Sequence, residues 1–227
     1  MSDGRNRRAL VVGATGLVGG ALLARLAEHR AYGRVATLGR RAPDFHHEGV
    51  AHHVADLSGD GAPIELPRAD VLFCCLGTTI KQAKTEAAFR AVDFDLVVQI
   101  AKQAAANGTN TFVGVSSIGA SADSRNFYLR TKGEMEQTVA RLGFKRSGFV
   151  RPSYLLGERE HFRFAEQVGR QINRLLNPVL LGGLTRYRAV DGDTVAAAMI
   201  GFDLSSALGS HIIEGKDIWR LAEREDG

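Results

Sequence analysis

Short apolar segments alternate with helical patterns along the first two thirds of this chain, and this alternation limits the fold more than any other feature. Apolar runs typical of strands occupy residues 8–14, 34–39, 50–57, 70–77, 110–117 and 147–153. Apolar residues at helical spacing occupy residues 17–29, 84–107 and 128–142. Strand–helix alternation of this kind builds parallel strands joined by right-handed crossovers. The pattern predicts an α/β fold with a doubly wound parallel sheet.

The last third of the chain is less regular. We expect a helix over 161–176 that stops before Pro178, a helix over 190–204 with Asp193 as its N-cap, and a short strand in HIIEG. No linker composition separates this part from the rest. We therefore predict one domain over residues 1–227, with 7–153 as its core and 154–227 as a small extension.

Composition limits the class of protein. Of the 227 residues, 44% are hydrophobic and the formal net charge is +4, so we expect a globular chain. The basic run RNRR at 5–8 is short and lacks aromatic residues, which favours a solvated tail over a nucleic-acid arm. The cysteines, Cys74 and Cys75, lie in an apolar run and are expected to be buried and unpaired. Without an apolar leader or spanning run, we predict a soluble cytoplasmic protein that binds neither nucleic acid nor membrane.

A glycine-rich turn follows the first predicted strand. GATGLVG places Gly13, Gly16 and Gly19 between that strand and an apolar helix. Small residues let backbone N–H groups approach a pyrophosphate, and the helix directs its positive end at it. A tight turn without a ligand is the alternative, but the position in the chain favours a dinucleotide. The expected contacts are Gly13, Thr15, Gly16, Leu17, Val18 and Gly19.

The end of the second strand bears on which nicotinamide cofactor is bound. An acid at this place hydrogen-bonds the ribose 2′-OH in proteins that prefer NAD. Here Gly39 is followed by Arg40 and Arg41, whose guanidinium groups suit a 2′-phosphate. Two exposed arginines without this role are the alternative. We predict NADP, held by Arg40 and Arg41, with Asp56 and Leu57 near the adenine.

Tyr128 stands four residues before Lys132 in a predicted helix, so the two side chains lie on one face, one turn apart. They form either a surface pair or a reaction centre. A free phenol ionises near pH ~10, too high for a base at neutral pH. An ammonium about 4 Å away attracts the phenolate by roughly 4 kcal/mol at an effective dielectric constant of ~20. Lys132 would therefore favour the phenolate form of Tyr128.

Several motifs together resemble those of the short-chain dehydrogenase/reductase superfamily. GATGLVG, CLGTT, the SS pair, YLRTK and RPS follow one another in an order and spacing similar to its extended and atypical members. Within it, the chain resembles the branch of the Tat-interacting-protein oxidoreductases, strongly over residues 8–155. The resemblance implies a Rossmann fold with the extension on the substrate side. It also implies that Tyr128 is the general acid or base and that Lys132 holds the ribose hydroxyls. Ser117 would polarise the substrate oxygen, with Ser116 as the less favoured alternative.

The same resemblance implies further cofactor contacts. CLGTT would line the adenine ribose and pyrophosphate, and RPS would lie along the nicotinamide. The residues are Leu76, Gly77, Thr78, Thr79, Ser116, Tyr128, Lys132, Arg151, Pro152 and Ser153. One departure concerns a catalytic position, where Asp93 stands in place of the asparagine usual in extended members. An ionised aspartate accepts hydrogen bonds but cannot donate them, so a water relay through Asp93 would differ.

These observations predict an NADP-dependent oxidoreductase that acts on a small carbonyl or alcohol substrate. Segments 154–164 and 184–188 would close an apolar or aromatic pocket. A cofactor-loaded regulatory protein with little turnover is one alternative. An epimerase or dehydratase is another, ranked lower because the short C-terminal part leaves little room for a nucleotide sugar. The seven histidines show no ligand spacing, so we expect no metal, and we expect a monomer or homodimer.

Overall fold

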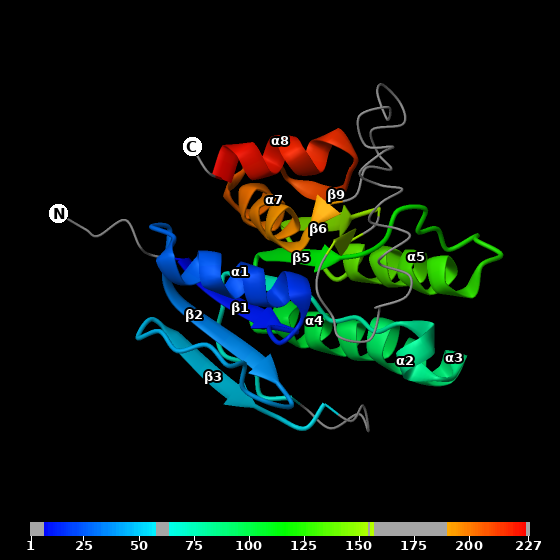
Figure 1. The fold of residues 1–227 in the computed structure, drawn as a ribbon, viewed down its shortest axis with the longest axis horizontal. Coiled ribbons are helices and arrows are strands. Elements are labelled where there is room, and N and C mark those ends of the chain that lie inside the picture. The colour runs from blue at the N-terminus through cyan, green and yellow to red at the C-terminus, as the bar shows by residue number, and fades with distance from the viewer. Residues whose placement is uncertain (1–6, 58–63, 154, 157–189, 226–227) are drawn as a thin grey trace.

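A parallel sheet with helices on both faces forms the body of the protein in a computed structural model that describes residues 7–57, 64–153, 155–156 and 190–225 (Figure 1). The sheet strands are β1 (Arg7–Val12), β2 (Tyr32–Gly39), β3 (Val50–Val54), β4 (Val71–Cys74), β5 (Thr111–Val115), β6 (Arg146–Arg151) and β9 (Gly209–Glu214). The helices are α1 (Leu17–Glu28), α2 (Ile80–Ala83), α3 (Glu86–Arg90), η1 (Ala91–Leu96), α4 (Val97–Ala106), α5 (Phe127–Ala140), α7 (Gly192–Leu204) and α8 (Lys216–Glu225). The short strands β7 (Leu155–Leu156) and β8 (Val190–Asp191) pair with each other.

The strand order confirms the predicted doubly wound sheet. The seven strands run β3-β2-β1-β4-β5-β6-β9, and all neighbouring pairs are parallel. The order reverses beside β1, which has β2 on one side and β4 on the other. Ligands of open parallel sheets bind at such a switch point, outside the carboxyl ends of the strands. The edge where β1, β4, β5 and β6 end is therefore the place to look for a site.

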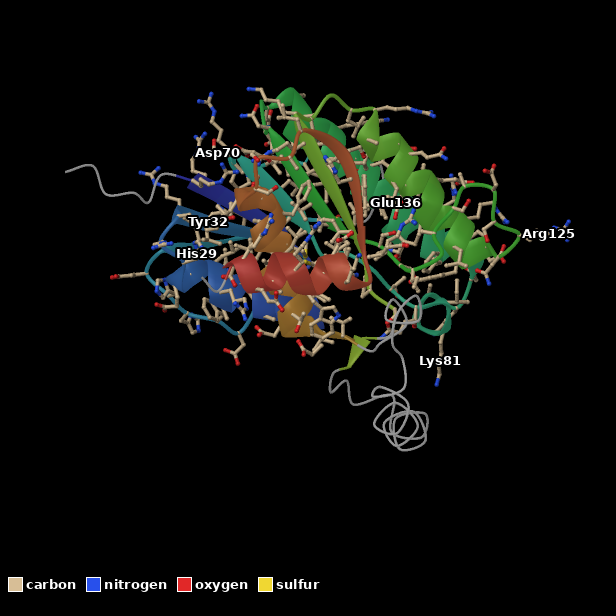
Figure 2. The ribbon with its side chains drawn as sticks, turned by 90° about the horizontal axis from the view of Figure 1, so that it is seen from above. His29, Tyr32, Asp70, Lys81, Arg125 and Glu136 are labelled. Atoms are coloured by element: carbon tan, nitrogen blue, oxygen red, sulfur yellow. The ribbon has the colours of Figure 1, made fainter. Side chains whose placement is uncertain are left out.

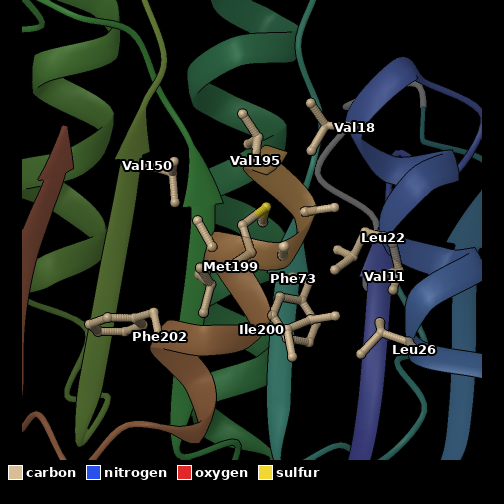
Figure 3. Close-up of a cluster of buried hydrophobic side chains, with 14 of the residues drawn as sticks. Val11, Val18, Leu22, Leu26, Phe73, Val150, Val195, Met199, Ile200 and Phe202 are labelled. Atoms are coloured by element: carbon tan, nitrogen blue, oxygen red, sulfur yellow. The ribbon is translucent and has the colours of Figure 1, made fainter. Parts of the chain in front are cut away.

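Two apolar clusters hold the helices to the sheet, one on each face. Alternate residues of a strand point to opposite faces. On β1, Ala9 and Val11 belong to the cluster with α1, α7 and α8, whereas Leu10 and Val12 belong to the cluster with α4 and α5. Figure 3 shows the first cluster, where Met199 and Ile200 of α7 approach the helix α1 and the sheet. The strand β4 is buried on both faces, as its continuous apolar run predicts.

The long helix predicted over 84–107 corresponds to α3, η1 and α4, which follow one another without a break over residues 86–106. Lys84 has φ +67°, which separates α2 from α3, and residues 91–96 form a π-helical segment, η1, before the chain continues as α4. A π turn widens the helix by one residue, which apolar spacing alone does not reveal. Asp93 lies in this segment with its side chain buried.

Near the C-terminal end, one prediction was wrong and one helix was missed. The N-cap of α7 is Asp191, whose carboxylate accepts a hydrogen bond from the Thr194 N–H, so the prediction of Asp193 was wrong. Asp193 instead pairs with Arg25 of α1 at 2.8 Å. The helix α8 was not predicted, because its many charged residues hide the buried stripe of Ile218, Leu221 and Ala222.

Some predictions fall outside the described residues. They are the helix over 161–176, the segment 184–188, and the segment 154–164 apart from Leu155 and Leu156. In the described part of the chain, no helix combines the length and apolar character needed to cross a membrane. Residues 190–225 complete the sheet through β9 and cover one face of it with α7 and α8.

Candidate cofactor and active site

The turn after β1 requires glycine at two positions. Gly13 has φ +85°, and a Cβ there would lie 2.6 Å from the carbonyl carbon and oxygen of Cys75. A Cβ on Gly19 would lie 2.2 Å from the Gly13 oxygen. The contact at Gly13 sets the β1–α1 turn against the end of β4, at the switch point of the sheet, and the contact at Gly19 packs the first turn of α1 against the Gly13 carbonyl. The glycine spacing is thus explained by close packing of this turn.

The N-terminus of α1 presents backbone donors beside that turn. Gly16 is the N-cap, and within the described residues no side chain caps its helix end. The Gly16 N–H itself bonds the Gly13 oxygen at 3.0 Å. Since the first N–H groups of a helix lack partners within the helix and carry its positive end, they suit a phosphate. The cradle made by Gly13 and Gly19 together with these donors fits a dinucleotide pyrophosphate.

Other residues predicted for the same cofactor region differ in accessibility. Thr15 is exposed, whereas Val18 is buried and Leu17 packs close to Gly192. The side chains of Leu17 and Val18 thus belong to the packing, and their N–H groups remain the candidate contacts. Arg40 and Arg41 follow β2 and are exposed.

The two residues predicted near the adenine, Asp56 and Leu57, differ in burial. Asp56 is exposed, whereas Leu57 is buried in the cluster with α4.

The loop after β4 is held to η1 through Asp93. The Thr78 N–H donates to Asp93 Oδ2 at 2.8 Å. A Cβ on Gly77 would lie 3.4 Å from Asp93 Oδ1 and 3.9 Å from Lys132 Nζ, so glycine lets the loop lie close to both charged groups. Thr79 caps α2 by accepting from the Gln82 N–H, and Leu76 packs against the core.

Tyr128 and Lys132 lie one turn apart in α5, as predicted. The helix begins after the N-cap Asn126, which accepts from the Leu129 N–H. The ring of Tyr128 is half-buried, with its centroid 5.4 Å from that of Phe89 in α3. The neighbouring hydroxyl of Thr131 is buried and has no hydrogen-bond partner among the described residues.

Lys132 is buried together with its counter-ion. Its ammonium lies 2.7 Å from Asp93 Oδ1, and the two side chains are 5% and 0% exposed. Burial tends to lower the pKa of Lys132, but the Asp93 carboxylate, with a smaller contribution from Tyr128, outweighs it and the pKa is raised. Lys132 is therefore a charged group in the site.

The serines after β5 differ in their surroundings. Ser116 is buried, and its hydroxyl has no hydrogen-bond partner in the part of the chain that the structure describes. Ser117 is half-buried and its hydroxyl approaches the Ile118 carbonyl at 3.4 Å. Both stand at the carboxyl end of a central strand, where a ligand could accept from them.

The RPS segment after β6 is tied to its neighbours. Two guanidinium nitrogens of Arg151, Nε and Nη2, donate to Glu136 of α5 at 2.9 and 2.6 Å, and Nη1 lies 3.6 Å from Glu214. Pro152 is buried and its carbonyl accepts from the Ile118 N–H. Ser153 is half-buried beside it. The side chain of Arg151 thus fixes α5 against β6, and a nicotinamide contact from this segment stays a prediction.

The strand order places the predicted site residues along one edge. The segments after β1, β4, β5 and β6 follow four neighbouring strands, and Arg40 with Arg41 follows β2 on the other side of β1. The structure joins three of the predicted catalytic or loop residues directly: Lys132, Asp93 and Thr78.

Two positioning residues were missed by the sequence analysis. Glu136 holds Arg151, and Gly133 lets α5 approach the loop at Ser121, where a Cβ would come within 2.2 Å of the Ser121 carbonyl carbon. A glycine inside a helical pattern was the available signal for the second.

Comparisons with known proteins agree with this geometry. Residues 9–196 match the model of the NAD dependent epimerase/dehydratase family. The chain is 36% identical to the protein FMP52, mitochondrial, of Eremothecium gossypii over 222 residues, which cover 96% of this chain and 98% of that protein. It is 34% identical to the protein HTATIP2 of Rattus norvegicus, with 98% of this chain and 92% of that protein covered. A solved structure of MoeE5 with UDP-glucose and NAD shares the fold at 15% identity, with a TM-score of 0.67 over 95% of this chain and 81% of that one.

The expected cytoplasmic location is wrong on this comparison, because several similar relatives are named as mitochondrial proteins. The expectation rested on a missing apolar leader and unpaired cysteines. Those features concern secretion and disulfide formation, and neither separates the cytoplasm from a mitochondrial compartment.

The resemblance to extended short-chain dehydrogenases/reductases is confirmed by the family match, the relatives and the fold together. A glycine turn at the switch point and a doubly wound sheet are what a dinucleotide-binding protein of this kind requires. The chain belongs to the NAD dependent epimerase/dehydratase family.

Proposed function

We propose that the protein is an NADP-dependent oxidoreductase of the short-chain type that acts on a small carbonyl or alcohol substrate. The observation that carries this proposal is the position of Lys132. Its ammonium lies close to Gly77 in the loop after β4, and the same face of α5 carries Tyr128 one turn earlier. A phenol and a lysine beside a dinucleotide cradle suit proton exchange coupled to hydride transfer.

The residues of the chain take separate roles in this reaction. NADPH, when bound, supplies hydride to the carbonyl carbon. Tyr128 donates its phenolic proton to the carbonyl oxygen, so its O–H bond breaks as the O–H bond of the alcohol forms. Ser117 donates a hydrogen bond to the same oxygen and orients it. Lys132 holds the ribose hydroxyls, and Asp93 fixes Lys132. In the reverse direction, the tyrosinate takes the proton of the alcohol.

The preference for NADP rests on the end of β2. Arg40 and Arg41 are exposed there, and Gly39 stands where an acid would repel a 2′-phosphate. We expect NADPH to bind at least about tenfold more tightly than NADH, which corresponds to roughly 1.4 kcal/mol. Fluorescence titration of both cofactors measures this difference. The double substitution Arg40→Ser and Arg41→Ser should remove it, and equal affinities in the parent chain would contradict NADP as the cofactor.

The Tyr128→Phe variant tests the acid. It should reduce carbonyl-dependent NADPH oxidation by at least about a hundredfold, the scale of general acid catalysis, because the phenyl ring has no proton to donate. NADPH affinity should stay within about twofold, since the substitution removes one hydroxyl from a half-buried ring. Turnover that survives in this variant would exclude Tyr128 as the acid.

Two other functions predict different results in activity assays. The family match favours an epimerase or dehydratase as a second candidate, and conversion of a nucleotide sugar without net NADPH consumption would support it. A cofactor-loaded regulatory protein is the third. Asp93 is ion-paired with Lys132 through Oδ1 and accepts from the Thr78 N–H through Oδ2, so its carboxylate is already engaged by the fold. Tight NADPH binding with no consumption across a broad carbonyl panel would support that role.

A further inference from the structure

A cleft lies over the strands β1, β2 and β3, beside the loop that precedes β4. Its volume is about 610 Å³, within the range of roughly 300–1,000 Å³ that is usual for small-molecule pockets. The charged residues that line it are Arg8, Arg34, Arg68 and Glu48. None of its described lining residues belongs to the candidate active site, so the cleft is a separate feature of the molecule.

The strand register places two of these arginines side by side. Arg8 of β1 is the register partner of Arg34 of β2, and neighbouring strands lie about 4.7–4.9 Å apart. Residues two apart on a strand point to the same face, and Leu10 belongs to the apolar cluster with α4 and α5. Both arginines therefore start from that face of the sheet, where like charges in neighbouring positions repel each other.

The arginines of the cleft differ in their counter-ions. Arg8 pairs with Asp70 at 2.7 Å. Arg34 and Arg68 are exposed, and neither forms an ion pair within the part of the chain that the structure describes. Glu48 is likewise exposed and unpaired among the described residues. The cleft thus holds two guanidinium groups that the described fold does not use, against one carboxylate.

The room in the cleft comes from small side chains. Ala36 of β2 and Ala51 of β3 are register partners, and both line the cleft on the same face as Arg34. The chain crosses this face as an irregular segment over residues 64–69, in which Ile64 and Leu66 are buried in the core. Two alanines beside a loop, where helices cover the rest of this face, leave a recess with an apolar floor.

The chemistry of the lining indicates the class of ligand. A guanidinium group is planar and matches two oxygens of a phosphate with two parallel N–H donors. The Glu48 carboxylate accepts hydrogen bonds and repels a second anionic group, so it suits a hydroxyl of the same ligand. A molecule with one phosphate and several hydroxyl groups satisfies both requirements.

We propose that this cleft binds a small sugar phosphate, whose phosphate is held by Arg34 and Arg68 and whose hydroxyl donates to Glu48. This site is additional to the proposed cofactor and active site and does not depend on it. The recess favours a free small molecule over a phospholipid headgroup, because its volume is that of a ligand pocket.

The test is a titration with glucose 6-phosphate, followed by nuclear magnetic resonance of isotope-labelled glycine amides. Gly33 and Gly49 line the cleft, whereas Gly13, Gly16 and Gly19 report on the cofactor turn. The Gly33 and Gly49 signals should shift with a dissociation constant below about 1 mM at roughly 0.15 M salt, where diffuse attraction is screened. Glucose without phosphate should leave them in place. Absence of a saturable shift at these two glycines, or an equal response to glucose, would overturn the proposal.

A charge-matched pair of variants locates the effect. Arg34→Gln with Arg68→Gln should weaken binding at least about tenfold, and both positions are exposed, so the fold should tolerate the change. Arg125→Gln with Arg141→Gln removes two exposed arginines elsewhere and should keep the affinity within about twofold. Figure 2 shows Arg125 at the end of the molecule opposite Asp70, the partner of Arg8. Equal affinities in the two double variants would show that net charge alone attracts the ligand.

Co-sedimentation with phosphatidylglycerol vesicles separates the two sources of phosphate. We expect no sedimentation with these vesicles. Sedimentation that the Arg34→Gln with Arg68→Gln variant abolishes, together with no response to glucose 6-phosphate, would identify a lipid headgroup as the ligand and overturn the small-molecule proposal.

Discussion

The two edges of the central sheet each carry a buried aspartate, and the two are used differently. At the amino edge, Asp203 of α7 accepts hydrogen bonds from Arg7 and from the Tyr32 hydroxyl, and Arg146 lies 3.4 Å away. At the carboxyl edge, Asp93 receives Lys132 and the Thr78 N–H. Figure 2 shows Tyr32 and Asp70 at the end of the molecule opposite Lys81 and Arg125.

This difference suggests that the amino edge contributes to stability and that the carboxyl edge is suited to bind a ligand. Asp203 joins β1, β2, β6 and α7 through two guanidinium groups and a phenol, so its acceptor capacity is filled by the fold itself. The carboxyl edge has ion pairs of Lys132 with Asp93 and of Arg151 with Glu136. Among the described residues, three buried atoms there have no hydrogen-bond partner: Asp93 Oδ1 and the hydroxyls of Ser116 and Thr131. Buried polar groups are normally satisfied, and unsatisfied ones at one edge indicate a place where a ligand supplies the partner.

The largest effect should come from Asp203→Ala. It removes the acceptor of Tyr32 and Arg7 and one of the acceptors of Arg146, which still donates to the Ser205 carbonyl and the Thr111 hydroxyl. Removing one partner of a buried pair typically costs about 3–5 kcal/mol. Urea unfolding measures the loss, and NADPH affinity should be retained below the transition. Asp123→Ala in an exposed loop is the control, with an effect within about 0.5 kcal/mol. If Asp203→Ala lost cofactor affinity in proportion to its lost stability, the two edges would not have the separate roles described above.

Gly13→Ala should combine a smaller loss of stability with loss of NADPH binding. Its positive φ costs an alanine on the order of 1–3 kcal/mol, and its Cβ would meet the Cys75 backbone. Gly143→Ala is a matched control, because Gly143 has φ +84° with nothing within 4 Å of a Cβ. By chemical denaturation, Gly143→Ala should show the cost of the positive φ alone and Gly13→Ala a larger loss, because the clash with Cys75 adds to it. Binding should be impaired only in Gly13→Ala. Equal binding in the two would mean that the glycine turn does not hold the cofactor.

Tyr32→Phe should cost about 1.5–3 kcal/mol, the range for a hydrogen bond to a charged group. Burial, with the Asp203 carboxylate, raises the pKa of Tyr32 above its usual 10.0. A raised folded pKa means that the contribution is fully present below pH ~10 and is lost as the pH rises further. The difference in unfolding free energy between the variant and the parent should therefore shrink in alkaline urea titrations, and a difference that grows there would contradict this assignment.

Asp70→Asn should have the smallest effect. Asp70 pairs with Arg8 at 2.7 Å at the same amino edge, but both side chains are partly exposed, so solvent screens the pair. The hydrogen bond from Arg8 lowers the pKa of Asp70 below its usual 3.8. The contribution is therefore present above that value and is lost as the pH falls through the folded pKa. Acid titrations of stability should show parent and variant converging at low pH, and divergence there would reverse the sign.

Much of this arrangement was predictable, because it depends on local patterns. The apolar runs located β1 to β6, and the glycine turn, the Tyr128–Lys132 spacing and the SS pair lie at the expected strand ends and helix face. The amino edge was not predictable. Arg7 and Tyr32 meet Asp203 across 196 and 171 residues, and no local spacing links residues so far apart.

The missed details at the site have the same physical origin. The partner of Lys132 depends on how η1 packs against α5. The RPS motif likewise gives no sign that the Arg151 side chain is already bound by Glu136. By contrast, the residues that follow each strand can be read from the order of the strands and helices along the sequence.

The π-helical segment η1 sets a rotational phase between two parts of one continuous helix. An ordinary helix advances about 100° per residue, so one residue fewer in this segment would swing Asp93 by that angle relative to the buried stripe of α4. Because of the wide turn, Ile100 and Ala104 are buried against the sheet while Asp93 still contacts Lys132. The extra residue thus lets one helix bury its apolar side chains against the sheet and also direct Asp93 at Lys132. Deleting one residue from it would cost the chain either that apolar packing or the counter-ion of Lys132.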